Sequence, residues 1–315
     1  MRSELKIMNT VCIHDIIRVG DNKSLGKREE TSMGHIRIVA DSTCDLSAEL
    51  IQKHGLTIIP LNIVLDMDSY MDGREITPRE IYDWSDQRNT TPKTAAPELG
   101  YVMEVLRPMA EAKEDIIFFG ISEDMSVTCQ VVRMAAQELE YDRIWVINSM
   151  NLSTGIGLQV LRAAEMAEEG THAEEIVVAI EAARAKVSAS FVVDTLTYLQ
   201  RGGRCNAVTA LVGNTLKLKP MIAVRDGKMG VARKYRGRQQ VVVRSYAGDL
   251  KEELLKADPA RVFITHSGID PAIEKEAYDY LADLNYFREI YITQAGGVIS
   301  SHCGPNTLGI LYYRQ

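Results

Sequence analysis

The segment "GGVISSHCGPNTLGI" places two serines, a histidine and a cysteine side by side between glycines. Ser300, Ser301, His302 and Cys303 are residue types that serve as nucleophiles, bases, metal ligands or hydrogen-bond donors. We interpret the segment as part of an extended strand, in which neighbouring side chains point to opposite faces. His302 and Cys303 then do not readily meet as base and nucleophile. Two interpretations stay open: a structural histidine, and a histidine that donates to the acidic group of a ligand.

Metal binding and hydrolase chemistry have little support in the sequence. No H-x-x-x-H or C-x-x-C spacing accompanies His302, so we expect no metal site. The G-x-S-x-G signature of serine hydrolases is absent. Scattered cysteines without C-x-x-C spacing favour reduced thiols over a disulfide framework. The cysteines are Cys12, Cys44, Cys129, Cys205 and Cys303.

The composition is that of a globular α/β protein of ordinary polarity. The chain has 315 residues, 46% hydrophobic and 25% charged, with a formal net charge of −7. This length allows two modest domains, and the negative charge disfavours nucleic acid as the main partner. No apolar run is long enough to span a bilayer, and the N-terminus lacks the apolar core of a signal peptide. We therefore expect a cytoplasmic protein without a transmembrane segment.

The elements that must position these residues begin with buried strands. The runs "DIIFFGIS" (115–122) and "DRIWVINS" (142–149) are continuously apolar, which is typical of strands buried on both faces of a parallel sheet. Helical patterns follow at 128–140 and 157–169, and "TIIPLNIVL" predicts a further strand at 57–65. This repetition predicts an α/β fold whose N-terminal sheet is doubly wound and mostly parallel.

The second half predicts a mixed sheet with helices. A long helical pattern covers 172–191, and Asp226 with Gly227 marks a hairpin turn. "EIYITQAGGVISSHCGP" reads as a further strand. The expected ligand cleft lies between two α/β domains. The expected divisions are an N-terminal extension at 1–34, an N-terminal α/β domain at 35–170 and a C-terminal α/β domain at 171–315.

Loops rich in hydroxyl side chains follow the apolar runs. Loops at the carboxyl ends of parallel strands converge on one crevice, where hydroxyls and helix N-termini can hold an anion. The alternative is that each hydroxyl only caps its own helix. The loops are "DSTCD" (41–45), "TTPKTAAP" (90–97), "SEDMSVTCQ" (122–130) and "NSMNLSTGIG" (148–157).

An ordered set of motifs resembles the DegV family from about His35 to the end of the chain. The motifs are "VADSTCDL", "TPKTAAP", "SEDMSVTCQVV", "NSMNLSTGIGL", "YLQRGGRCN", "LKLKPMIAV" and "GGVISSHCGPNTLGILY". Members of that family are similar to the lipid-binding subunit of bacterial fatty acid kinase. The resemblance implies that one long-chain fatty acid is held between two α/β domains, and that a separate kinase phosphorylates its carboxylate. It implies a non-catalytic protein with no cofactor other than this ligand.

The resemblance also implies site residues. Thr94 is similar to the threonine that hydrogen-bonds the carboxylate, and Ser126 to the serine that follows the third strand. Arg204 and His302 are similar to the basic residues near the head group, so we expect His302 to donate to a carboxylate or phosphate. The supporting loop residues are Ser42, Thr43, Thr128, Ser153, Gly155, Gly202, Gly203 and Ser301.

The chain departs from the family pattern in its loops. Val127 replaces a glycine, and a β-branched residue rarely takes positive φ, so we expect this loop to sit differently. Ala95 and Ala96 replace a hydroxyl and an amide, and Asn148 and Asn306 replace an aspartate and a glycine. Residues that either line a tail tunnel or pack as ordinary core are Leu152, Ile156, Leu158, Leu161, Leu196, Leu199 and Met221.

A basic segment at 217–238 is the candidate partner surface. It either docks an acidic kinase or is a solvated hairpin. Its cations, accompanied only by Asp226, are Lys217, Lys219, Arg225, Lys228, Arg233, Lys234, Arg236 and Arg238. Two rival functions stay open: a small-molecule hydrolase or transferase that uses Ser126 or Cys303 in the same cleft, and a sensor of a non-lipid ligand.

Overall fold

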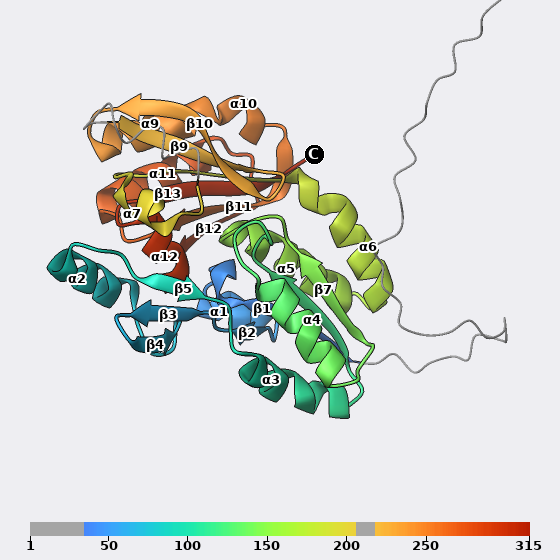
Figure 1. The fold of residues 1–315 in the computed structure, drawn as a ribbon. Coiled ribbons are helices and arrows are strands. Elements are labelled where there is room, and N and C mark those ends of the chain that lie inside the picture. The colour runs from blue at the N-terminus through green and yellow to red at the C-terminus, as the bar shows by residue number, and fades with distance from the viewer. Residues whose placement is uncertain (1–34, 206–217) are drawn as a thin grey trace, which may run out of the picture. The chain divides into compact units, whose positions relative to one another are not determined.

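The computed structural model describes residues 35–205 and 218–315, which belong to one compact unit (Figure 1). The predicted extension at 1–34 and Lys217 of the basic segment lie outside the described residues. In the described part, the strands form three sheets. The division into domains at 35–170 and 171–315 stays a prediction, and we call these ranges the N-terminal and C-terminal halves.

The first sheet is parallel throughout, as its apolar runs predicted. Its order is β2–β1–β6–β7, and β6 is buried on both faces. Alternate β6 side chains pack against two helical layers, α3 with α4 and α5 with α6, which confirms the doubly wound arrangement. The strands are β1 (Ile36–Asp41), β2 (Thr57–Ile59), β6 (Asp115–Gly120) and β7 (Ile144–Asn148). The helices are α1 (Ala48–Lys53), α3 (Leu99–Glu111), α4 (Thr128–Glu138), α5 (Thr154–Glu168) and α6 (Ala173–Ala183), with a 3₁₀ turn η1 (Ser42–Cys44) after β1.

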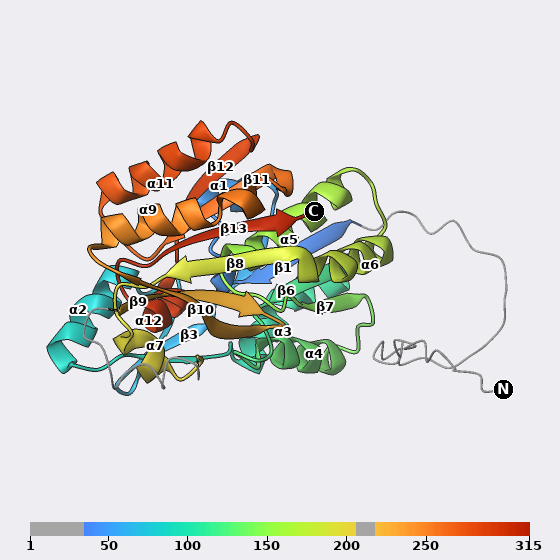
Figure 2. The same ribbon diagram turned by 90° about the horizontal axis from the view of Figure 1, so that it is seen from above.

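The second sheet is mixed, as predicted. Its order is β10–β9–β8–β13–β11–β12, in which β11 and β12 are parallel and the other pairs antiparallel. Figure 2 shows α9 and α11 side by side over its outer face. The strands are β8 (Val187–Val192), β9 (Leu218–Arg225), β10 (Lys228–Arg236), β11 (Ala257–His266), β12 (Glu289–Gln294) and β13 (Leu308–Arg314). The helices are α7 (Thr197–Gly202), α9 (Gln239–Asp249), α10 (Lys251–Leu254) and α11 (Pro271–Asp283).

A small antiparallel sheet, β4–β3–β5, was not predicted. The run at 57–65, expected as one strand, is two strands in different sheets, because Pro60 separates them and proline lacks the N–H that a continuous ladder needs. Part of the loop expected at 90–97 is strand β5, which carries Thr94. The strands are β3 (Asn62–Leu65), β4 (Asp68–Met71) and β5 (Lys93–Ala95), and α2 (Pro78–Arg88) begins with a capping box from Thr77.

The expected strand around His302 is wrong, because residues Gly297–Cys303 form helix α12. The β-branched pair Val298 and Ile299 favoured a strand, but tertiary contacts decide here. Gly296 caps the helix, and Gly304 takes a φ of 74° directly after it. In Figure 1, α12 lies between the small sheet and the second sheet.

The long helix expected at 172–191 is also shorter than predicted. α6 ends at Ala183, and after the 3₁₀ turn η2 (Arg184–Lys186) the chain continues as β8. β8 is paired on both sides, with β9 and β13. Those two ladders outweigh the weak strand propensity of its serines and alanine.

Candidate functional site

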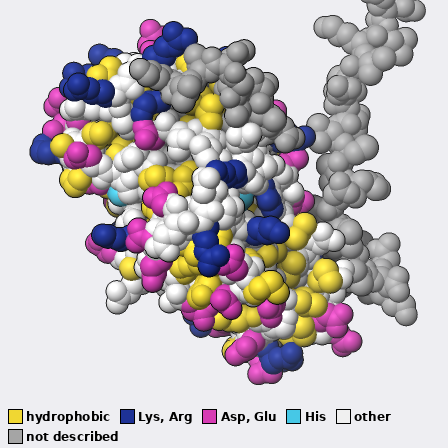
Figure 3. Space-filling model, turned by 60° about the vertical axis from the view of Figure 1, so that its left-hand side comes forward, with side chains coloured by type: hydrophobic (Ala, Val, Ile, Leu, Met, Phe, Trp, Pro, Cys, Tyr) yellow, Lys and Arg dark blue, Asp and Glu magenta, His cyan; other side chains and the backbone are white. Residues whose placement is uncertain are grey.

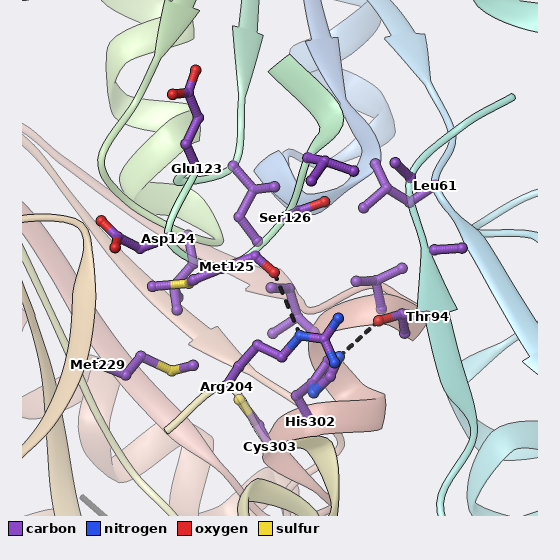
Figure 4. Close-up of a pocket in the computed structure, with 17 residues that line it drawn as sticks. Leu61, Thr94, Glu123, Asp124, Met125, Ser126, Arg204, Met229, His302 and Cys303 are labelled. Atoms are coloured by element: carbon purple, nitrogen blue, oxygen red, sulfur yellow. Dashed lines mark hydrogen bonds between the residues drawn. The ribbon is translucent and has the colours of Figure 1, made fainter. Parts of the chain in front are cut away.

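A cavity of about 430 Å³ lies between the two halves (Figure 4). Its wall is largely apolar, and four of the polar side chains that line it come from different elements. The apolar wall includes Leu61, Ile121, Met125, Leu152, Val298 and Ile299. These four polar side chains are Thr94, Ser126, Arg204 and His302, which we call the polar end of the cavity, so the structure places the four residues predicted to hold a carboxylate on one cavity.

Thr94 and His302 form a hydrogen-bonded pair at the polar end. Thr94 Oγ1 lies 2.8 Å from His302 Nε2, which joins β5 to α12. Burial, and then the nearby Arg204 charge, lower the pKa of His302 to about 4. The imidazole is therefore neutral at physiological pH and carries one N–H. A neutral imidazole can donate a hydrogen bond but supplies no positive charge to the cavity.

The second ring nitrogen of His302 is enclosed. Nδ1 has no hydrogen-bond partner among the described residues. A Cβ added at Gly202 would lie 2.2 Å from this nitrogen, so a glycine is required where α7 passes the ring. Gly202 therefore supports the site by its lack of a side chain, and Gly203, with a φ of 66°, ends α7.

Ser126 lies in the loop between β6 and α4. Its hydroxyl is 2.8 Å from Thr128 Oγ1, a bond that ties the serine to the first turn of α4. Val127 takes a φ of −86°, which a β-branched residue adopts without strain, and the expected difference in the placement of this loop stays a prediction. Its side chain is 58% exposed at the cavity rim, which adds an apolar surface to the entrance.

Arg204 is the cation of the cavity in the part of the chain that the structure describes. Its guanidinium donates to Gly202 O at 3.1 Å and to Met125 O at 3.4 Å. Two acidic residues also line the cavity, but each has a partner. Glu123 pairs with Arg133 at 2.7 Å and Asp124 with Lys228 at 3.4 Å. Arg204 is thus left as the charge available to an anionic ligand.

The other predicted supporting residues lie behind the cavity wall. Thr128 bonds Ser126, Ser42 donates to Asp72, Ser153 donates to Asp45, and Ser301 donates to the Gly297 carbonyl. Thr43 donates to Asp41, and Gly155 packs directly on Asn151. None of these residues lines the described cavity. Their hydrogen bonds tie the loops behind the cavity to neighbouring residues.

The predicted tail residues mostly belong to the core. Leu152 lines the cavity, whereas the others do not. Ile156, Leu158, Leu161 and Leu199 are buried core residues, and the partly buried Leu196 and Met221 pack against the core. Pattern alone could not separate cavity from core, because both kinds of position are apolar.

Three buried aspartates were missed as site residues. Asp41, Asp45 and Asp72 are each at most 5% exposed, and burial raises the pKa of all three, that of Asp41 to about 6. Among the described residues, no lysine or arginine forms an ion pair with them. The first two stand in the "DSTCD" loop, where their unusual burial had no signal in the sequence.

Neither candidate nucleophile is activated. Burial raises the pKa of Cys303 to about 12, so its thiol stays protonated. Ser126 contacts no histidine or carboxylate in the described structure, and a serine nucleophile needs an adjacent base. In the same ranges no cluster of three metal-ligating residues occurs, and no described helix is long and apolar enough to cross a bilayer.

The basic segment is partly neutralised. Lys219 pairs with Asp194, Lys228 with Asp124, and Arg233 with Asp249. On the face of the molecule in Figure 3, positive and negative side chains are interspersed. Exposed cations of this segment without an ion pair in the described chain are Arg225, Lys234, Arg236 and Arg238.

The fold and the cavity define an α/β protein with a largely apolar pocket that is also lined by hydroxyl, imidazole and guanidinium groups. Residues 35–315 match the family model described as "Uncharacterised protein, DegV family", and the chain belongs to this family. A DegV domain-containing protein of Deinococcus radiodurans is 30% identical over 277 residues, which cover 87% of this chain and 97% of that protein.

Solved structures of relatives share the architecture. A DegV family protein from Thermus thermophilus, whose structure is reported for fatty acid binding, is 30% identical with a TM-score of 0.81, covering 89% of this chain and 100% of that chain. A stearic acid-binding protein from Eubacterium ventriosum is 27% identical with a TM-score of 0.77, covering 89% of this chain and 98% of that one.

Proposed function

We propose that this protein binds a long-chain fatty acid, with the tail in the cavity and the carboxylate at its polar end. The observation that carries the proposal is a single cavity that joins an apolar wall to Thr94, Ser126 and Arg204. Relatives of the same fold bind fatty acids, which supports this ligand class.

The two ends of the cavity suit the two ends of such a ligand. Burial of the tail contributes about 0.8 kcal/mol per CH₂ group, so a long chain can supply most of the affinity. An ionised carboxylate must be paired when it leaves water. Arg204 provides charge, and the hydroxyls of Thr94 and Ser126 provide donors.

His302 acts through Thr94 in this proposal. A neutral imidazole with its proton on Nε2 donates to Thr94 Oγ1, which leaves the threonine hydroxyl hydrogen free for the carboxylate. The closed surroundings of Nδ1 favour this tautomer, because a proton there would have no acceptor in the described structure. His302 thus orients the donor instead of supplying charge.

We also propose that the bound carboxylate is presented to a separate fatty acid kinase. The protein itself is then non-catalytic, in keeping with the inactive state of Ser126 and Cys303. The exposed cations Arg225, Lys234 and Arg236 would dock an acidic surface of the kinase. A variant with these three residues changed to glutamine tests the docking surface. Slower phosphorylation of the bound fatty acid by the kinase would support it.

The head-group assignment is tested by Thr94→Ala and Ser126→Ala. Each change removes a donor to a charged group, so we expect stearic acid affinity to fall roughly 10- to 100-fold. The melting temperature of the ligand-free protein should change little. Ser69→Ala, at an exposed position of β4, is the matched control and should bind as the wild type does. Undiminished affinity in both site variants would contradict the assignment.

A further inference from the structure

Helix α12 is the element that places His302. It has seven residues, and His302 lies in its last turn, so any tilt or shift of the helix moves the imidazole relative to Thr94. Too short to be stable alone, such a helix depends on tertiary contacts for its position. What holds its first turn therefore decides the geometry at the polar end of the cavity.

Two aspartates hold that first turn. Asp45 Oδ1 accepts the N–H of Gly296 at 2.8 Å, and Asp72 Oδ1 accepts the N–H of Gly297 at 2.7 Å. Asp45 follows η1, whereas Asp72 follows β4, so the helix start is fixed from two independent elements. Carboxylates at a helix start also interact favourably with its dipole.

The second oxygen of each carboxylate is fixed as well. Ser153 donates to Asp45 Oδ2 at 2.5 Å, which links this carboxylate to the start of α5. Ser42 donates to Asp72 Oδ2 at 2.8 Å, and the same hydroxyl accepts from the N–H of Leu61, a cavity residue. Each carboxylate therefore has one defined orientation.

We call Asp45 and Asp72 together the clamp. The first residues of α12 pack closely against it. A Cβ added at Gly297 would lie 2.5 Å from Ile63 Cδ1 and 2.9 Å from Asp72 Oδ1. At Gly296 it would lie 3.3 Å from both carboxylates. Only a backbone without side chains can approach the two acids so closely.

The clamp is costly for stability. Asp45 and Asp72 are 5% and 3% exposed, and no cation pairs with them in the described ranges. Burial raises the pKa of both carboxyls, and Asp72 adds to the shift of Asp45 by repulsion. The buried charge itself therefore opposes stability, and what each carboxylate supplies in return is a pair of acceptor oxygens, which an amide of the same shape does not have.

We propose that Asp45 and Asp72 are positioning residues, which fix α12 and thereby hold the His302 imidazole against the Thr94 hydroxyl. The inference rests on the proposed function, in which Thr94 holds the ligand carboxylate. When either acid is removed, the first turn of α12 can move, and His302 then no longer orients the Thr94 hydroxyl.

Asp45→Asn and Asp72→Asn test the clamp in the full-length protein. We expect each to weaken stearic acid binding about tenfold with little change in the ligand-free melting temperature, because relief of the buried charge offsets the loss of one acceptor oxygen. The ¹⁵N signals of the His302 side chain, assigned with His302→Gln, should shift in both. Asp270→Asn is the matched control: Asp270 accepts the Ala272 N–H at the start of α11, so its loss should leave affinity and the His302 signals unchanged.

Unchanged affinity and unchanged His302 signals in both variants would overturn the inference. An affinity loss accompanied by a lower melting temperature of the ligand-free variant would also overturn it. Ser153→Ala, which removes the donor to Asp45, tests the same clamp if Asp45→Asn does not fold. The His302 signals are read without ligand, so they test the positioning independently. A wild-type protein without affinity for stearic acid would contradict the proposed function alone.

Discussion

His302 lies 2.8 Å from Thr94 through Nε2, and its surroundings decide which form of the imidazole is present. Burial and the Arg204 charge both disfavour the protonated ring, so its pKa is lowered to about 4. A histidine with this pKa is neutral while the ligand carboxylate is ionised. The charge that meets the carboxylate must then come from Arg204.

The protonation of His302 can be measured directly. We expect its ¹⁵N side-chain signals to titrate with a pKa of about 4, well below the usual 6.5, in the ligand-free protein. Because the folded-state pKa is lowered, the unfolded state binds the proton more tightly, and the contribution of His302 to stability is lost as pH falls from about 6.5 towards 4. Titration near the usual 6.5 would contradict the argument that burial and the Arg204 charge keep this imidazole neutral.

At the residue scale, the resemblance placed Thr94, Ser126, Arg204 and His302 together, and the structure puts all four on one cavity. Their chemical states could not be predicted in this way. The neutral form of His302 depends on burial and on a neighbouring guanidinium that is 98 positions away in the sequence, and local sequence does not report either.

At the element scale, strands were predictable where their surroundings are uniform. β6 is buried on both faces, so a continuous apolar run marked it, and a similar run marked the mostly half-buried β7. α12 was missed, because its β-branched residues favour a strand and the acids that hold its start come from distant loops. Pro60 indicates the break between β2 and β3, because proline interrupts a continuous strand.

Close packing between α7 and α12 gives a test at this scale. Gly202→Ala would place a Cβ 2.2 Å from His302 Nδ1, so the ring or α7 must move. We expect a loss of about 1–3 kcal/mol in the free energy of unfolding and weaker stearic acid binding. Gly100→Ala in α3, where no atom lies within 4 Å of the added Cβ, should not destabilise the protein. Equal effects of the two changes on stability and binding would contradict the packing argument.

At the scale of the whole molecule, the cavity exists because two sheets and α12 meet. The described core supports this, since one buried cluster includes Phe119 of the first sheet and Phe191 and Phe263 of the second. The β-α repetition predicted the parallel sheet and, with the hairpin signal, the mixed one. It gave no sign of the small sheet that carries Thr94, because its strands are only three or four residues long.

The most direct test of the account is mass spectrometry of the purified protein, first native and then after denaturation and organic extraction. We expect one bound molecule per chain that is released on denaturation and has the mass of a long-chain fatty acid. An empty protein that also takes up no added stearic or other long-chain fatty acid would contradict the account, and a released molecule of another class would identify a different ligand for the cavity.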